Sequence, residues 1–223
     1  ETAAAFGNSP KVVCVGNPIL QDFSTVDREA ARTKLGIGKD QTLILSFGGS
    51  NGAEKVNEAV IDFMKSTVAN DHKIIHLHAS GKINYEDASK LFCEAGLDKA
   101  ENCILRPYIY DMPWQMAAAD VVIARAGAMT LSELALMKKT CVLIPSPNVA
   151  ENHQYKNAKA LADANAAILV EEKDLGEGEL TKAVCSLLTN ASRCREQEAN
   201  IAAFAQEDAC QRIWQDIVKL TNK

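Results

Sequence analysis

The sequence lacks the features that mark several large classes of protein. Among its 223 residues, 24 are Lys or Arg and 29 are Asp or Glu, which gives a net charge of −5. Nucleic-acid binding depends on clustered basic residues, so we expect no nucleic-acid partner. No apolar run approaches the roughly 20 residues that a membrane-spanning helix needs. Backbone dipoles can bind a small anion without net positive charge, so that class of ligand stays open.

Metal and disulfide patterns are also absent. The seven cysteines are odd in number, scattered and never spaced as C-x-x-C: Cys14, Cys93, Cys103, Cys141, Cys185, Cys194 and Cys210. We predict reduced cysteines that pack as small apolar side chains in a cytoplasmic protein. No D-x-D pair is present, and His76 and His78 on one strand face have no third ligand in view, so no metal is predicted. The chain begins at Glu1 without a charged-then-apolar leader, and we expect a processed chain or an excised domain.

Short apolar runs alternate with stretches of helical period along the first 170 residues. Several runs are nearly continuous, as in strands that are covered on both faces of a parallel sheet. This alternation predicts βαβ units in a doubly wound parallel α/β sheet. The predicted strands are Lys11–Gly16, Thr42–Phe47, Lys73–Ala79, Asn102–Leu105, Asp120–Ala124, Thr140–Ile144 and Ala167–Val170.

Helical periodicity fills the spaces between these runs and continues after them. Gly36 and Gly96 are expected to end the helices that precede them. We predict a ligand-binding α/β domain over residues 1–170 and a tail of helices over residues 171–223. The predicted helices are Arg28–Leu35, Ala53–Ala69, Glu86–Ala95, Asp111–Ala118, Met129–Lys138, Asn152–Ala164, Glu179–Thr189, Ser192–Ala205 and Asp208–Leu220.

Ligands of open α/β sheets bind beyond the carboxyl ends of the strands, which directs attention to four loops. The first is Gly48-Gly49-Ser50-Asn51-Gly52, between a predicted strand and a predicted helix. It matches neither the dinucleotide nor the Walker glycine pattern. Its glycines could let the backbone approach a phosphate, or they could serve tight packing alone, and the sequence leaves both interpretations open.

The second loop runs from Arg125 to Glu133, again before a helix. Thr130-x-x-Glu133 has the spacing of a capping box, in which the two side chains satisfy free N–H groups at a helix start. Alternatively, the amides of Gly127–Thr130 face a phosphate, and Glu133 accepts hydrogen bonds from two ribose hydroxyls. Spacing alone favours the cap.

The third and fourth loops carry less specific signals. In the third, Pro145–Gln154, His153 is more plausible as a hydrogen-bonding or surface residue than as a proton-transfer group. In the fourth, Arg106–Met112, Tyr108 and Ile109 offer an aromatic face and backbone groups for a flat base, or Asp111 simply caps the following helix.

Taken in chain order, the motifs of these loops carry a more specific signal. They are Gly16-Asn17-Pro18, Gly48-Gly49-Ser50-Asn51-Gly52-Ala53, His78-x-Ser80-Gly81-Lys82, Tyr108-Ile109-x-Asp111-Met112, Ala118-Ala119-Asp120, Arg125-Ala126-Gly127-Ala128-Met129-Thr130-x-Ser132-Glu133 and His153-Gln154-x-x-Asn157-Ala158. The series resembles the carboxyl-terminal half of the MurG family of bacterial cell-wall glycosyltransferases. The resemblance covers residues 11–170 approximately, with a compatible helical tail.

The resemblance implies the donor-binding half of an inverting N-acetylglucosaminyltransferase that converts lipid I to lipid II in peptidoglycan synthesis. It implies a two-domain GT-B architecture, with a Rossmann-like half here and UDP-N-acetylglucosamine as the ligand. The acceptor site and general base belong to an amino-terminal half that binds lipid I and the membrane. No catalytic residue, metal or cofactor is therefore expected in this half. The complete protein is expected at the cytoplasmic face of the cell membrane.

Single residues also receive roles by this resemblance. The uracil edge would pair with the backbone of Ile109, and Glu133 would hold the ribose. His153, Gln154 and Asn157 would lie near the sugar hydroxyls. The diphosphate would face Ser50, Asn51, Gly52, Gly127, Ala128, Met129 and Thr130.

Two single-residue departures and two alternative functions accompany this interpretation. Leu20 stands where many relatives have Arg, so a cationic contact to the donor is missing or supplied elsewhere. His153 stands where some relatives have Gln. The alternatives are a non-catalytic nucleotide-sugar-binding subunit and another GT-B enzyme, such as a glycolipid glycosyltransferase or a UDP-sugar epimerase. The last helix either packs on this domain or reaches the amino-terminal one, and an exposed stripe of Ile213, Trp214, Ile217 and Leu220 would indicate the second arrangement.

Overall fold

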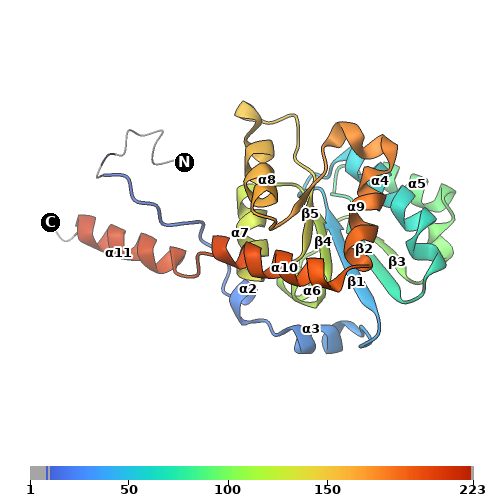
Figure 1. The fold of residues 1–223 in the computed structure, drawn as a ribbon, viewed down its shortest axis with the longest axis horizontal. Helices are drawn as coiled ribbons and strands as arrows, with labels where there is room; N and C mark the ends of the chain where they lie inside the picture. Colours follow the sequence, from blue (N-terminus) through green and yellow to red (C-terminus); the bar gives the residue numbers. More distant parts are fainter. Residues whose placement is uncertain (1–8, 10, 222–223) are drawn as a thin grey trace.

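The computed structural model describes residues 9 and 11–221, and its centre is one parallel sheet (Figure 1). The strand order is β3-β2-β1-β4-β5-β6, and every neighbouring pair is parallel. The order reverses between β1 and β4, which makes that junction the switch point of a doubly wound fold. The predicted fold class is confirmed. The strands are β1 Thr42–Phe47, β2 Ile74–Ala79, β3 Cys103–Arg106, β4 Val121–Ala124, β5 Cys141–Leu143 and β6 Ile168–Leu169.

Helices cover both faces of the sheet, which explains the continuous apolar strands. One core joins Leu43 and Leu45 to helices α3, α6, α7 and α8, and the other joins Ile44 to helices α4, α5 and α9. The helices are α2 Asp22–Thr25, α3 Arg28–Leu35, α4 Glu54–Ser66, α5 Tyr85–Glu94, α6 Met112–Ala118, α7 Ala128–Leu136, α8 His153–Asp163, α9 Glu179–Leu188, α10 Ala191–Ile201 and α11 Ala209–Thr221. The predicted helices are all present, with bounds shifted by a few residues. Gly36 directly follows α3 with a left-handed φ of 71°, and Gly96 lies two residues after the end of α5 with a φ of 74°, so both mark helix ends as predicted.

The prediction of a strand at Lys11–Gly16 is wrong. These residues are irregular, and Val13 is 59% exposed. The apolar run has strand character, but no strand of the described sheet lies beside it to complete its hydrogen bonds. Gly16 has a φ of 80° and passes so close to Gln206 that a Cβ there would lie 2.9 Å from the Gln206 Cβ.

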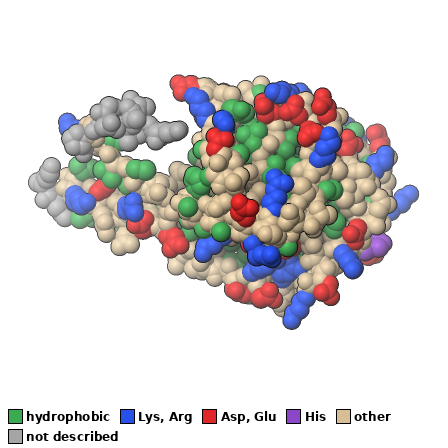
Figure 2. Space-filling view, viewed as in Figure 1, with side chains coloured by type: hydrophobic (Ala, Val, Ile, Leu, Met, Phe, Trp, Pro, Cys, Tyr) green, Lys and Arg blue, Asp and Glu red, His purple; other side chains and the backbone are tan. Residues whose placement is uncertain are grey.

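The carboxyl-terminal helices differ in how many of their side chains are buried. Helix α9 buries Leu180, Val184 and Leu187, whereas α11 buries only Ala209 and extends away from the sheet (Figure 1). Trp214 and Leu220 are 65% and 72% exposed, and Figure 2 shows hydrophobic side chains on this extension. Contact of α11 with another domain stays a prediction.

The cysteines are all free, and only part of their predicted packing is correct. Cys103 and Cys141 are buried, whereas Cys14, Cys93 and Cys210 are exposed. Within the described residues, no helix is both long and apolar enough to cross a membrane.

A buried polar network connects β1 and β2. Ser46 Oγ lies 2.7 Å from His76 Nε2 and 2.8 Å from His78 Nδ1. His78 Nε2 lies 3.0 Å from Asn57 Oδ1 on α4, and Asn57 Nδ2 donates to the Ser80 carbonyl at 3.1 Å. Burial lowers the pKa of His78 to about 4 and lowers the pKa of His76 well below 6.5. Both rings are therefore neutral at pH 7 and serve as hydrogen-bonding partners.

This network predicts a loss of stability in mild acid. Below about pH 6.5 the two histidines take up protons in the unfolded chain but not in the fold. Each should lower the free energy of unfolding by up to about 1.4 kcal/mol per pH unit between 6.5 and 4. In urea denaturation at pH 7, 6 and 5, the free energy of unfolding should decrease less steeply with falling pH for His78→Gln than for the original chain. His72→Gln, which changes an exposed histidine, should retain the original decline, and equal slopes for all three proteins would contradict the prediction.

Candidate functional site

A pocket of about 460 Å³ opens at the carboxyl ends of β1, β2 and β4, next to the switch point. It is lined by Leu20, Phe23, Phe47, Gly49, Ser50, Ala79, Pro107, Tyr108, Ile109, Tyr110, Met112, Pro113, Met129, Thr130 and Glu133. A larger hollow of about 540 Å³ lies at the opposite end of the sheet. Three charged groups of its wall are already partnered, since Arg28 pairs with Asp120 and Lys139 Nζ donates to two carbonyls, and it lies away from the strand ends where ligands of such sheets bind. The smaller pocket is therefore the candidate site.

The glycine-rich loop after β1 is held by the loop after β2. A Cβ on Gly52 would lie 1.9 Å from the Ser80 carbonyl oxygen, and a Cβ on Gly81 would lie 2.1 Å from the Gly52 nitrogen. Asn84 Nδ2 adds a hydrogen bond of 2.9 Å to the Asn51 carbonyl. Gly49, in contrast, lines the pocket with a φ of 95°, and a Cβ there would meet nothing within 4 Å. Tight packing explains Gly52, whereas Gly49 keeps the backbone open to the pocket.

The helices that follow the pocket loops after β1 and β4 start without a side-chain cap. The residue before α4 is Ala53 and the residue before α7 is Gly127, and neither makes a capping hydrogen bond. The first-turn N–H groups of a helix have no partners within the helix and carry the positive end of its dipole. Two helix starts of this kind, with Ser50 and Thr130 beside them on the pocket wall, form an environment suited to an anion.

The predicted capping box of Thr130 and Glu133 is wrong. Helix α7 begins at Ala128, so Thr130 lies inside the first turn rather than before it. The turn after β4 places Gly127 at the cap position, where no side chain is available. Glu133 is consequently left free of a capping role, and its side chain lines the pocket.

The Glu133 carboxyl is the single charged group in the pocket wall, and it is half-buried. Burial raises its pKa to about 7. The raised pKa has no contribution from a hydrogen bond or a neighbouring charge, so no group of the described chain compensates the carboxylate. Ligand hydroxyls could supply that compensation, because an ionised carboxylate accepts hydrogen bonds from several donors.

The loop after β3 forms the aromatic side of the pocket. Tyr108 and Tyr110 lie edge to face with their ring centroids 4.8 Å apart, and Ile109 between them is buried. Asp111 occupies the cap position of α6, but its carboxylate accepts from Gln115 Nε2 at 3.0 Å and from no backbone N–H of the helix start. The explanation of this loop as a simple Asp cap is therefore wrong.

The third predicted loop lies outside this pocket wall and is tied to its neighbours. Gln154 Oε1 accepts from the Ser146 N–H at 2.9 Å, and Asn157 Nδ2 donates to the Ala126 carbonyl at 3.2 Å. His153 is exposed, with Nδ1 at 2.9 Å from the Ala150 carbonyl oxygen. The bond of Asn157 connects helix α8 to the loop before α7, and the bond of Gln154 connects it to the loop after β5.

The pocket brings together five of the predicted site residues, namely Ser50, Ile109, Met129, Thr130 and Glu133. The other predicted residues are close in the chain or tied to the same loops but are not in the wall: Asn51, Gly52, Gly127, Ala128, His153, Gln154 and Asn157. The sequence interpretation missed the apolar wall residues Phe23, Phe47 and Met112. Their side chains carry no chemical signal, and they come from separate segments that only the fold brings together.

Comparisons with known proteins agree with this architecture. The family described as Glycosyltransferase family 28 C-terminal domain matches residues 43–213. A UDP-N-acetylglucosamine--N-acetylmuramyl-(pentapeptide) pyrophosphoryl-undecaprenol N-acetylglucosamine transferase of Acetivibrio thermocellus is 38% identical over 222 residues, which are 98% of this chain and 59% of that protein. The Bacillus subtilis protein of the same name is 31% identical and is matched over 60% of its length. The chain thus spans about three fifths of the curated relatives.

Solved structures give the same result. The crystal structure of Acinetobacter baumannii MurG has a TM-score of 0.75 and 27% identity, and covers 98% of this chain and 63% of that one. The S. aureus MnaA-UDP co-structure has a TM-score of 0.71 at 13% identity, covers 98% of this chain and 57% of that one, and supports the fold alone.

Glycine substitutions should separate the packing and pocket functions of the loop. Gly52→Ala should lower the free energy of unfolding by about 3 kcal/mol or more, because its Cβ would overlap the Ser80 carbonyl at a left-handed φ. Gly49→Ala has open space and should cost about 1 kcal/mol from its φ alone. Gly127→Ala, at a φ of −69° with open space, is the control and should change stability by less than about 0.5 kcal/mol. Equal losses for Gly52→Ala and Gly49→Ala in urea denaturation would contradict this loop contact.

Proposed function

The chain belongs to the glycosyltransferase family 28 C-terminal domain family, and on that premise we propose that it is the donor-binding half of an inverting N-acetylglucosaminyltransferase. Its donor is UDP-N-acetylglucosamine, and the complete protein adds the sugar to lipid I to give lipid II at the cytoplasmic face of the cell membrane. The names of the curated relatives support this choice of donor and acceptor. An amino-terminal half supplies the acceptor site and the general base.

The observation that carries the proposal is the pairing of two uncapped helix starts with one uncompensated carboxyl in a single pocket. In the proposed complex, the diphosphate lies against the first turns of α4 and α7, near Ser50 and Thr130. The ribose hydroxyls donate to Glu133, and the uracil edge pairs with the backbone of Ile109. A nucleoside diphosphate has negatively charged phosphates, which match the helix starts, and a ribose diol, which matches the carboxyl.

The proposed reaction uses this half for charge stabilisation. The acceptor hydroxyl attacks the anomeric carbon from the face opposite the leaving UDP, and the bond from that carbon to the diphosphate oxygen breaks. Negative charge then grows on the diphosphate, where fixed N–H dipoles stabilise it without having to reorganise. No side chain of this half takes the acceptor proton in this scheme.

Binding of the donor tests the function directly. Titration calorimetry of the chain with UDP-N-acetylglucosamine should give saturable binding, with weaker binding of UDP-glucose and UDP-galactose. Glu133→Ala should weaken UDP-N-acetylglucosamine about 10- to 100-fold, as expected for the loss of hydrogen bonds to a charged group. Glu94→Ala, an exposed change on helix α5, is the matched control and should bind like the original chain. A chain that binds none of the three nucleotides would overturn the proposal.

The pKa of Glu133 predicts how this affinity changes with pH. Ribose hydroxyls bind the ionised carboxylate better than the neutral acid, and burial raises its pKa to about 7 in the free chain. The affinity for UDP-N-acetylglucosamine should therefore increase as the pH rises from 6 to 8, with a change near pH 7 and a slope of at most about tenfold per pH unit below it. The donor diphosphate keeps a constant charge over this range. Glu133→Gln should remove this component of the pH dependence, and an unchanged profile in that variant would refute the ribose assignment.

A further inference from the structure

The motif His78-x-Ser80-Gly81-Lys82 contains a cation that the proposed function has not used. The Lys82 ammonium lies 4.8 Å from the ring centroid of Tyr108 and 5.4 Å from that of Tyr110. Both tyrosines belong to the pocket wall. The Lys82 backbone N–H donates to the Ser50 carbonyl at 3.3 Å, so the residue is attached to the glycine-rich loop. Lys82 therefore connects the glycine-rich loop, which borders the proposed diphosphate position, with the aromatic loop after β3.

The pocket wall itself supplies no positive side chain. Its single charged group is the carboxyl of Glu133, and Leu20 on the wall is uncharged. Helix starts provide only partial charges, and a diphosphate carries two full negative charges. A cation at the pocket mouth would complete the electrostatic match.

Of the other cations near these strand ends, Arg106 is the exposed last residue of β3, whereas Arg125 and Lys55 lie against other groups. The Arg125 guanidinium forms a buried ion pair with Glu172 and donates to the carbonyls of Ile144 and Pro145, both at 3.2 Å. Lys55 in the first turn of α4 borders a separate hollow with Glu172. Lys82 has no carboxylate partner within the described part of the chain, and only aromatic faces hold its ammonium.

The anchoring of Lys82 suits a movement of its side chain alone. Gly81 has a φ of 85° and lies against Gly52, so the backbone of this turn is fixed. The lysine side chain is a flexible four-carbon chain with a point charge at its end. It can therefore leave the exposed ring of Tyr110 for an anion on the neighbouring loop without any backbone change.

We propose that the Lys82 ammonium contacts the diphosphate of the bound nucleotide. In the free chain this ammonium lies against the rings of Tyr108 and Tyr110. This inference rests on the proposed function and names the residue that completes its diphosphate site. An ammonium held by aromatic faces avoids pairing with a protein carboxylate, which a ligand would otherwise have to displace. The contact adds affinity for the phosphates and no selectivity for the base.

Three variants and two ligands test this assignment. Lys82→Met should weaken UDP about 10- to 30-fold in titration calorimetry, while uridine, which has no phosphate, should bind as it does to the original chain. Lys82→Arg keeps the charge and should remain within about threefold of the original affinity for UDP. The salt dependence of UDP binding should also become weaker in Lys82→Met.

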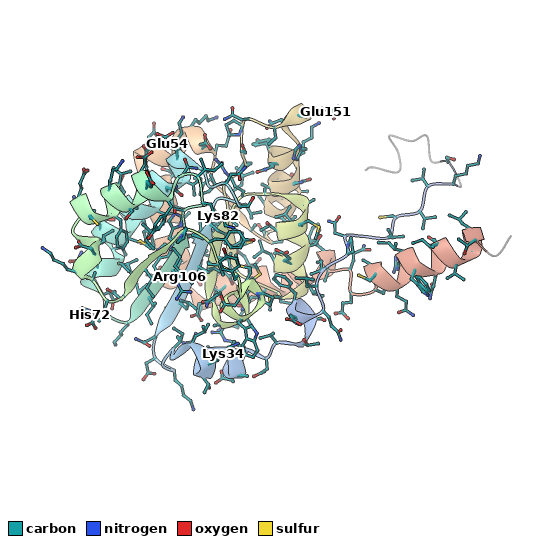
Figure 3. The ribbon with its side chains drawn as sticks, turned by 180° about the vertical axis from the view of Figure 1, so that it is seen from behind. Lys34, Glu54, His72, Lys82, Arg106 and Glu151 are labelled. Atoms are coloured by element: carbon teal, nitrogen blue, oxygen red, sulfur yellow. The ribbon has the colours of Figure 1, made fainter. Side chains whose placement is uncertain are left out.

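Lys34→Met provides a matched control. Lys34 also lies over an aromatic ring, at 3.6 Å from the Trp114 centroid, and Figure 3 labels it on α3, on a different element from Lys82. This variant should leave UDP affinity unchanged. If the original chain binds UDP and Lys82→Met binds it equally well, the inference is overturned while the proposed function stands. Equal losses for UDP and uridine would also overturn it, since they would indicate a structural role. Failure of the original chain to bind UDP would overturn the proposed function instead.

Discussion

The arrangement of the pocket depends on the contact between the backbones of Gly52 and Gly81. With no side chain on either residue, the turn after β1 lies directly on the turn after β2. The Ser80 carbonyl at this contact also accepts a hydrogen bond from Asn57 Nδ2. Asn57 Oδ1 lies within hydrogen-bond distance of His78, and the other ring nitrogen of His78 contacts Ser46 Oγ. The glycine-rich loop is therefore fixed from both sides, and the start of α4 is held at the pocket edge. The interior imidazoles that provide this support make the fold sensitive to acid.

The electrostatic potential in the pocket has two sources: the fixed dipoles of the helix starts, and side chains whose protonation or position can change. Uncapped helix starts contribute a permanent positive potential, which explains how a chain with a net charge of −5 could accept an anion. Glu133 would repel the same anion when ionised, and burial keeps a large part of it neutral near pH 7 in the free chain. In the proposed complex, the ribose hydroxyls compensate its charge at a distance from the phosphates. In this proposal the acid lies at the ribose end and Lys82 at the phosphate end, so that the two opposite charges are kept apart.

The sequence was sufficient for the fold class because the buried strands are apolar on both faces, as in Leu43–Leu45. The same pattern gave a wrong strand prediction at Lys11–Gly16, because an apolar run does not reveal whether a neighbouring strand is available for pairing. The capping box at Thr130 failed for a related reason: the turn after β4, rather than the Thr-x-x-Glu spacing, determines where α7 begins. Five predicted site residues meet in the pocket because strand ends converge in this fold. The approach of Lys82 to Tyr108 depends on β2 and β3 being neighbours, which no local pattern encodes.

Selectivity for the transferred sugar poses a different physical problem from binding of the nucleotide. Backbone N–H groups and a lysine attract any diphosphate, and the base and ribose contacts are the same for all UDP-sugars. Discrimination among sugars must therefore come from groups beyond the diphosphate, and the resemblance implies that His153, Gln154 and Asn157 lie near the sugar hydroxyls. The side chains of Gln154 and Asn157 already hold Ser146 and Ala126. A sugar hydroxyl could use only their remaining donors and acceptors, whose directions these two bonds fix. The hydrogen bonds that tie α8 to the loops after β5 and before α7 would thus determine which hydroxyl configuration finds a partner.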